Sequence, residues 1–139
     1  MAKVRKEVEL AVRLPETGGG FGEVLHTVAG DAVNVLAFCH YRDPAGSVVL
    51  LIADDPVAAK DSIESAGFPC KANAVIVVNA PDQVGAAARI GAHLHQAGIE
   101  ILYSYASAAS AGEFLAVFKT SDDELALSVL AESVVSRAA

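Results

Sequence analysis

The order of the predicted elements occurs twice along the chain, and this repeat constrains the fold more than any other feature. Each half reads as a strand, a helix, two strands joined by a turn, and a second helix. We predict the first set at residues 7–14, 21–30, 33–41, 47–53 and 56–67, and the second at residues 70–78, 84–97, 99–106, 112–119 and 121–135. We align the halves by pairing Gly22 with Gly85 and Asn34 with Gly98. The pattern indicates a tandem duplication of a β-α-β-β-α-β unit.

The first strand and helix illustrate the local patterns behind this prediction. Over residues 7–14 apolar and charged residues alternate, and Glu9 falls among the charged ones. Such alternation is typical of a strand with one face in solvent. In the helix that follows, apolar residues recur at helical spacing, which places them on one side. Both elements therefore offer one apolar face to a shared core.

The lengths available between the helices predict how the two halves join. Between the second helix and the loop before the third there is room for only one strand, at residues 70–78. We expect this strand to end the first unit and to begin the second. Only residues 136–139 follow the last helix, too few for a final strand. The sequence thus predicts an α+β fold of two ferredoxin-like units with mainly antiparallel sheets, at residues 7–71 and 72–139, and the second unit lacks a clear final strand.

Composition and charge exclude several classes of protein. Hydrophobic residues make up 53% of the 139 residues, which indicates a packed core, and the longest uncharged stretch, from Ile101 to Gly112, is too short to span a membrane. The net charge is −7, and basic residues are scattered apart from Lys3, Arg5 and Lys6, so nucleic acid and membranes are poor partners. The N-terminus lacks the apolar region of a signal peptide, so we expect a cytoplasmic protein.

Two pairs of adjacent carboxylates are the obvious candidates for acid–base catalysis, but both have a structural interpretation. The pairs at residues 54–55 and 122–123 each precede a predicted helix, where Asp is favoured as N-cap. Pro56 stands at the first helical position after the first pair. Ser121 and Glu124 have the spacing of a capping box at the start of the last helix. We therefore predict no catalytic role for either pair.

The remaining candidates for metal, thiol or nucleotide chemistry are equally weak. His93 and His95 stand two apart on one helix and point to different sides, so they cannot hold one metal ion together. Cys39 and Cys70 are predicted to be buried thiols. The glycines of residues 18–22 do not fit the dinucleotide-binding pattern, and this loop either binds a carboxylate or is merely flexible. The sequence predicts no catalytic residue, no metal and no cofactor, hence no enzyme.

Each half resembles an ACT domain, and the whole chain is similar to stand-alone proteins made of two ACT units in tandem. Residues 81–85, Pro-Asp-Gln-Val-Gly between a strand and a helix, carry the resemblance together with residues 97–103. Val84 stands where the ACT turn commonly has proline, and residues 20–22, Gly-Phe-Gly, replace the Pro-Gly pair in the first half. The resemblance implies a ferredoxin-like regulatory module that binds a free amino acid.

The resemblance also implies where the ligand lies, because ACT ligands sit between the first loop of one unit and the second-strand region of a partner unit. The implied ligand-binding residues are Asp82, Gln83, Val84, Gly85, Ile99 and Glu100 in the second half, and Glu16, Gly20, Phe21 and Asn34 in the first. The backbone N–H groups of residues 83–85 would bind the carboxylate of an amino acid, and Asp82 or Glu100 its ammonium group. Asn34 is equally well explained as a helix-terminal residue.

Two functions remain open from the sequence. One is an amino-acid-binding regulatory or sensor protein, and the other is a non-catalytic interaction protein whose ligand site is lost. For both we predict a homodimer, because a second unit without its last strand would leave a sheet edge with unpaired backbone groups. The small apolar residues near the second loop, among them Ala80 and Ala86, favour a ligand with a branched or small side chain.

Overall fold

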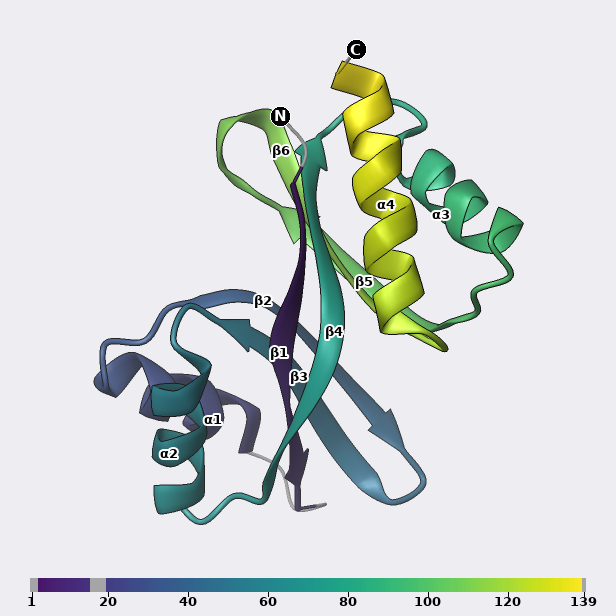
Figure 1. The fold of residues 1–139 in the computed structure, drawn as a ribbon. Coiled ribbons are helices and arrows are strands. Elements are labelled where there is room, and N and C mark those ends of the chain that lie inside the picture. Colours follow the sequence, from purple (N-terminus) through teal and green to yellow (C-terminus); the bar gives the residue numbers. More distant parts are fainter. Residues whose placement is uncertain (1–2, 16–19, 139) are drawn as a thin grey trace. The chain divides into compact units, whose positions relative to one another are not determined.

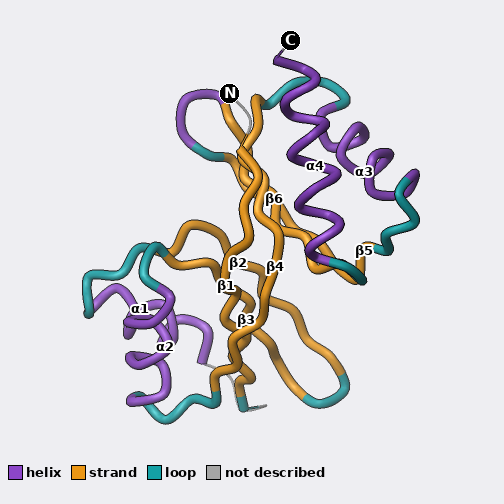
Figure 2. Tube along the Cα trace, in the orientation of Figure 1, coloured by secondary structure: helices purple, strands orange, loops and turns teal. Residues whose placement is uncertain are grey.

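A computed structural model describes residues 3–15 and 20–138 of the protein. For residues 133–138 the description covers the backbone alone. The elements follow in the predicted order (Figures 1 and 2): β1 (Lys3–Leu14), α1 (Gly20–Gly30), β2 (Val35–Asp43), β3 (Gly46–Ala53), α2 (Pro56–Ser65), β4 (Cys70–Pro81), α3 (Ala86–Gln96), β5 (Ile101–Ala108), a 3-10 turn η1 (Ser110–Gly112), β6 (Glu113–Thr120) and α4 (Asp123–Ala138). Strand β1 pairs with β3, β2 with β3, β4 with β6 and β5 with β6, all antiparallel. This confirms the predicted α+β class with ferredoxin-like units.

The chain divides into two compact units. The first unit is Val8–Asn73, and the second joins Ala74–Ala139 with Met1–Glu7, of which the structure describes residues 3–7 and 74–138. Strand β4 is continuous across the boundary, as the sequence predicts for residues 70–78. Strand β1 also belongs to both units, since residues 3–7 lie in the second. The predicted boundaries at residues 71 and 72 differ from this division mainly in the placement of the N-terminal residues.

The second unit obtains a fourth strand from the start of the chain. Within this unit the strand order is β1-β4-β6-β5, so β4 has a neighbour on each side. Arg5 of β1 donates a hydrogen bond from Nη1 to Oδ1 of Asn79 on β4 at 2.6 Å. Strand β1 therefore covers the side of β4 that the missing final strand would have left unpaired. Counting residues after the last helix could not reveal a strand that comes from the other end of the sequence.

Both helices of each unit pack on the same face of its strands (Figure 1). The core of the first unit contains Leu10, Val12, Leu14, Val24, Val28, Val33, Val49, Leu51, Ala53, Ala59 and Ile63. That of the second contains Ile76, Val78, Ala80, Leu94, Ile99, Ala116, Phe118, Ala126 and Leu130. The strand residues in both lists alternate along their strands, and alternate residues share one face of a sheet. This confirms the prediction of helices on one sheet face in each unit.

The opposite face of the first unit differs from the prediction. Glu9, expected in solvent, is fully buried, and β3 beside it is buried along its whole length. Alternation in the sequence separates the two faces of a strand but does not show whether the second face meets water. Cys39 and Cys70 are free and only partly buried, rather than buried as predicted. Burial still raises the pKa of the Cys70 thiol, so its reactive thiolate form is disfavoured.

Equivalent hydrogen bonds in the two units show that Asn34 corresponds to Glu100, so the predicted pairing of Asn34 with Gly98 is wrong. The same alignment places Gly22 opposite Ala88, so the predicted pairing of Gly22 with Gly85 is wrong as well. The N–H of Asn34 donates to Oδ1 of Asp54 at 3.0 Å, and the N–H of Glu100 donates to Oγ of Ser121 at 3.0 Å. In return, the N–H groups of Asp54 and Ser121 donate to the carbonyl oxygens of Asn34 and Glu100 at 3.0 and 2.9 Å. We call the resulting correspondence of the two units the Asn34–Glu100 alignment.

The cause of the error lies at the ends of α1 and α3. Ala32, with φ 60°, follows α1 where Gly98, with φ 75°, follows α3. A left-handed residue after a helix is commonly glycine, and the alanine in the first unit conceals the correspondence. The β-bulges of β2 and β5, just after Val35 and Ile101, confirm the Asn34–Glu100 alignment.

One carboxylate of each adjacent pair caps a helix, as predicted. Oδ1 of Asp55 accepts a hydrogen bond from the N–H of Ala58 at 3.1 Å, and Oδ1 of Asp122 accepts one from the N–H of Leu125 at 3.1 Å. The predicted capping box is wrong in one respect, because Ser121 does not cap α4. Its hydroxyl accepts the N–H of Glu100 instead, which joins the start of β5 to the end of β6. The neighbouring carboxylate of Asp122 caps the helix in its place, because it reaches a backbone N–H of the first turn.

Asp123 at the start of α4 should make the stability of the second unit depend on pH. Its Oδ1 accepts a hydrogen bond from the Thr120 hydroxyl at 2.6 Å, and its Oδ2 accepts one from Nζ of Lys119 at 3.1 Å. Burial acts to raise the pKa of Asp123, but these hydrogen bonds outweigh it and hold the pKa below its usual value. The ionised form is therefore the one that the fold stabilises.

We expect Asp123→Asn to lower the free energy of unfolding at pH 7 by about 1 to 2 kcal/mol. Because the folded pKa is depressed, this stabilisation is complete above the unfolded pKa of about 4 and disappears as the pH falls through the folded value. Urea denaturation between pH 7 and pH 2.5 measures the difference between the two proteins. Asp61→Asn, on the exposed surface of α2, serves as control. A difference that is the same at all pH values would contradict the assignment.

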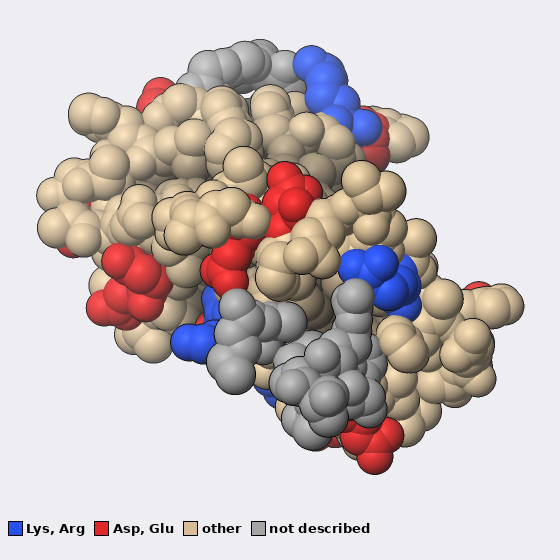
Figure 3. All heavy atoms as spheres, turned by 90° about the horizontal axis from the view of Figure 1, so that it is seen from above, with Lys and Arg blue, Asp and Glu red and all other residues tan. Residues whose placement is uncertain are grey.

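None of the described helices is long and apolar enough to cross a membrane. On the face that Figure 3 shows, Lys and Arg side chains stand in separate groups with Asp and Glu side chains among them. Charge on this face is therefore mixed rather than gathered into one basic patch.

Candidate functional site

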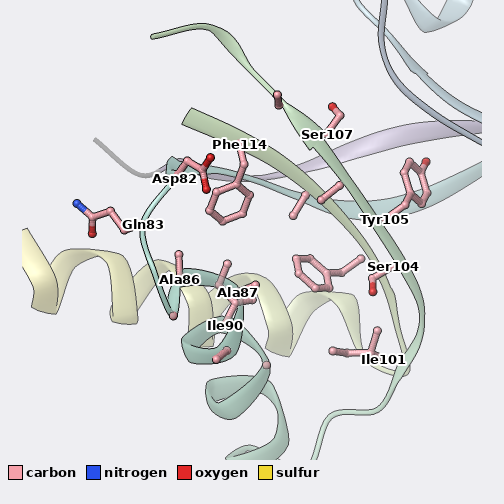
Figure 4. A pocket seen from close by; sticks show the side chains of 17 residues that line it. Asp82, Gln83, Ala86, Ala87, Ile90, Ile101, Ser104, Tyr105, Ser107 and Phe114 are labelled. Carbon is pink, nitrogen blue, oxygen red and sulfur yellow. The ribbon is translucent and has the colours of Figure 1, made fainter. Parts of the chain in front are cut away.

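A hollow of about 810 Å³ lies in the second unit beside the start of α3 (Figure 4). Its walls come from the loop after β4, from one side of α3, and from β5 and β6. The lining residues are Asp82, Gln83, Gly85, Ala86, Ala87, Ala88, Ile90, Gly91, Ile101, Ser104, Tyr105, Ala106, Ser107, Ala108, Phe114, Ala116 and Phe118. Apolar side chains dominate this set, and Asp82 is its one charged member. Such a hollow can take a molecule with an apolar body and a charged end.

The loop between β4 and α3 shapes one end of the hollow. Strand β4 ends at Pro81, and the N–H of Asp82 donates to the carbonyl oxygen of Gly112 at 2.8 Å. The N–H of Ala86 donates to the carbonyl oxygen of Gln83 at 3.1 Å, which closes a tight turn. Gly85 has φ 84° in this turn, a conformation that favours glycine. The turn leads directly into α3 and leaves Asp82 and Gln83 at the mouth of the hollow (Figure 4).

The start of α3 is suited to a negatively charged group. The backbone N–H groups of residues 83–85 and of Ala87 and Ala88 form no hydrogen bond to another described residue. Such N–H groups and the helix dipole make a helix N-terminus electropositive. Arg89 adds a positive charge nearby, since its Nη1 lies 3.5 Å from the carbonyl oxygen of Val84. Its Nε is buried and has no hydrogen-bond partner in the part of the chain that the structure describes.

Comparison with known proteins gives a result for the fold only. No protein-family model matches the chain, and none of the curated proteins matches its sequence. Among solved structures, protein BT0572 from Bacteroides thetaiotaomicron is 23% identical with a TM-score of 0.85, over 94% of this chain and 90% of that one. The regulatory subunit of aspartate kinase from Thermus thermophilus, in its ligand-free form, is 13% identical with a TM-score of 0.66, over 94% and 95% of the two chains.

A third structure, aspartokinase III of E. coli in complex with lysine and aspartate, is 15% identical with a TM-score of 0.52, and the similarity covers 91% of this chain and 31% of that one. These three structures and this chain share one arrangement of helices and strands. The fold is of the ACT type. Sequence identity is 23% at most among the three, so the similarity establishes the fold of this ACT-type chain and not its ligand.

Three of the residues that the sequence predicts for the second unit of this ACT-type fold line the hollow, namely Asp82, Gln83 and Gly85. Val84 is fully exposed at the tip of the loop, and Ile99 is buried in the core. Glu100 follows the C-terminal end of α3, and an 11-residue helix places about 16 Å between its two ends. The structure therefore brings Asp82, not Glu100, to the electropositive helix start.

The residues predicted in the first ACT-type unit do not line this hollow. Gly20 is buried, and a Cβ there would lie 3.0 Å from the Leu14 side chain. Phe21 packs its ring on that of His40. Asn34 uses its backbone to join Asp54, and Glu16 lies outside the described residues.

Sequence reasoning missed most of the apolar lining. In the sequence, Ala87 and Ala88 look like ordinary residues of a helix, and Ser104 and Ala106 look like ordinary residues of a strand. The signal that could have found them is a comparison of the two halves in the Asn34–Glu100 alignment. That comparison shows small residues in the second half where the first has large ones. Three or more His, Cys, Asp or Glu side chains in an arrangement able to hold a metal ion do not occur among the described residues.

Proposed function

We propose that this protein is a regulatory or sensor module that binds a free amino acid in the hollow of its second unit. The carrying observation is the arrangement around α3, where one hollow combines apolar walls, an electropositive helix start and the carboxylate of Asp82. An α-amino acid has the matching features, namely a carboxylate, an ammonium group and a side chain of its own. The ACT-type fold, shared with regulatory subunits of aspartate kinase, supports a role in regulation rather than in catalysis.

Each charged group of an amino acid has a complementary partner at the mouth of the hollow. The carboxylate would accept hydrogen bonds from the N–H groups of residues 83–85 and from the first turn of α3. The ammonium group would donate to the exposed carboxylate of Asp82, a charge-assisted hydrogen bond. The side chain of the ligand would then point along α3 toward Ile90 and Ile101, which line the hollow beyond its mouth (Figure 4).

Asp82→Ala should weaken binding of the amino acid by about 10- to 150-fold, because it removes one charged hydrogen bond of about 1.5 to 3 kcal/mol. The fold should be retained, since the side chain of Asp82 is exposed in the loop. A screen of the twenty amino acids for a rise in melting temperature identifies the ligand, and calorimetry on both proteins gives the affinities. Asp61→Ala, an exposed Asp on α2, is the matched control. Unchanged affinity in Asp82→Ala would place the site elsewhere.

A second candidate function is that of an interaction protein, and the edge strands favour it. Strands β2 and β5 expose large apolar side chains, and Phe38 and Leu102 are 51% and 58% exposed. If none of the twenty amino acids binds, this function replaces the first.

We infer for either function that the chain forms a homodimer through such a strand, because exposed apolar edges pair readily. Sedimentation at high micromolar concentration should show a dimer that Leu102→Glu or Phe38→Glu weakens, and a monomeric wild type would contradict it.

A further inference from the structure

The hollow of the second unit has a counterpart in the first unit, and that counterpart is filled. Equivalent hydrogen bonds and β-bulges relate α1 to α3 and β2 to β5 in the Asn34–Glu100 alignment. This alignment pairs Phe21 with Ala87, Phe38 with Ser104, and His40 with Ala106. The three residues of the second unit all line the hollow. The same three places in the first unit therefore carry aromatic rings.

The aromatic rings of the first unit are in contact. The rings of Phe21 and His40 are stacked, with their centroids 4.7 Å apart and their planes within 10° of each other. The ring of Phe38 lies 5.5 Å from that of Phe21 at an angle of 52°. Phe21 also packs against the core of the first unit. An aromatic group thus fits between the first helix and the second strand of this fold, with a flat ring lying against the strand.

The second unit leaves the same place open. Residues 87, 104 and 106 are alanine or serine, so the three aromatic rings of the first unit are absent from a region that the backbone still surrounds. Larger side chains form the walls, namely those of Ile90 and Phe114 (Figure 4). Phe118 of β6 also lines the hollow. Beyond Asp82 at the mouth, none of the residues that line this region is charged. A charged ligand side chain would therefore lose its hydration there without gaining a partner.

We propose that the hollow selects a ligand with a bulky apolar group of about the size of a phenyl ring, and that Ala87, Ser104 and Ala106 determine this specificity. The proposal rests on the proposed function, because it assumes that the hollow is the ligand site. The ring takes the place that Phe21 occupies in the first unit, while Asp82 and the start of α3 hold the charged groups. This differs from the small or branched side chain that the sequence favours, because small lining residues leave more room for the ligand.

Calorimetry with five amino acids tests the selectivity. L-Phenylalanine should bind on the order of 10- to 100-fold more tightly than L-alanine, because burial of the ring adds apolar area. L-Leucine should fall between them, and L-lysine and L-glutamate should bind no better than L-alanine. Indole, which has a ring but neither charged group of an amino acid, serves as a second probe of the same place.

Ala87→Phe transfers the ring of the first unit into the second and should weaken binding of L-phenylalanine and of indole at least about 10-fold. Ala92→Phe makes the same change at an exposed position of α3 outside the hollow and should leave both affinities unchanged. Ser104→Phe, the counterpart of Phe38, provides a second blocking variant if Ala87→Phe does not fold.

The outcomes separate this inference from the proposed function. If indole binds, Ala87→Phe blocks that binding, and none of the amino acids binds, the result would support a site for an aromatic ring in the hollow. The same result would overturn the proposed function. Tighter binding of L-lysine or L-glutamate than of L-phenylalanine would support the proposed function and overturn this inference. This inference would also be overturned if the wild type and both blocking variants bound L-phenylalanine and indole with equal affinity. It would be overturned as well if the wild type bound neither compound.

Discussion

Leu94→Ala should lower the free energy of unfolding by about 3 to 5 kcal/mol, the largest effect we expect from one substitution in the second unit. Leu94 is completely buried on α3 and packs in the core with Ile76, Val78 and Leu130. Removing its branched end leaves a cavity as well as losing the free energy of transfer from water. Urea denaturation followed by circular dichroism measures the loss.

Leu125→Ala is the matched control for this prediction. Leu125 is 42% exposed on α4, so the same substitution there should change the free energy of unfolding by less than about 1 kcal/mol. A loss below about 1 kcal/mol in Leu94→Ala would show that the core of the second unit closes around the missing side chain. The description of α3 as packed through Leu94 would then be wrong.

Gly85→Val should lower the free energy of unfolding by about 2 to 3 kcal/mol and should abolish detectable amino-acid binding. Gly85 has φ 84° at the start of α3, where a β-branched residue is strained. A Cβ at this position would also lie 3.2 Å from Nη1 of Arg89. The strain would displace the turn that holds Asp82 at the hollow and the N–H groups of residues 83–85.

Gly85→Asn separates the backbone from the side chain in this prediction. Asparagine adopts the left-handed conformation at lower cost than valine, so the loss of stability should be less than half as large. Arg89 can move away from the added Cβ, because Nη1 is the far end of a flexible side chain. Thermal denaturation and calorimetry on both variants supply the comparison. Equal losses in the two variants would mean that the left-handed conformation of Gly85 is unimportant.

The candidate site could be predicted in part. The motif of residues 81–85, between a strand and a helix, predicts a ligand-binding loop through its resemblance to the ACT turn. The structure places Asp82, Gln83 and Gly85 of this loop at the mouth of a hollow. The same reasoning did not find the inner lining, because alanine and serine in a helix or strand carry no chemical signal of their own. Glu100 looked equivalent to Asp82 as an acidic residue near a loop, but α3 separates the two along its length.

The sequence alone determined the order of the elements, the antiparallel α+β class, the capping by Asp55 and the strand shared between the units. Each of these depends on local periodicity, on caps or on the number of residues between elements, all of which are properties of short segments. Asp55 caps its helix because only neighbouring residues are needed for that hydrogen bond.

Only the tertiary structure decided which segments from distant parts of the sequence lie together. It placed residues 3–7 with the second unit, buried Glu9, and paired Asn34 with Glu100 in the alignment of the halves. It also revealed that the place filled by Phe21 in the first unit is hollow in the second. Such features depend on contacts between segments far apart in the chain, and the volume left between a helix and a strand is the result of all the side chains around it.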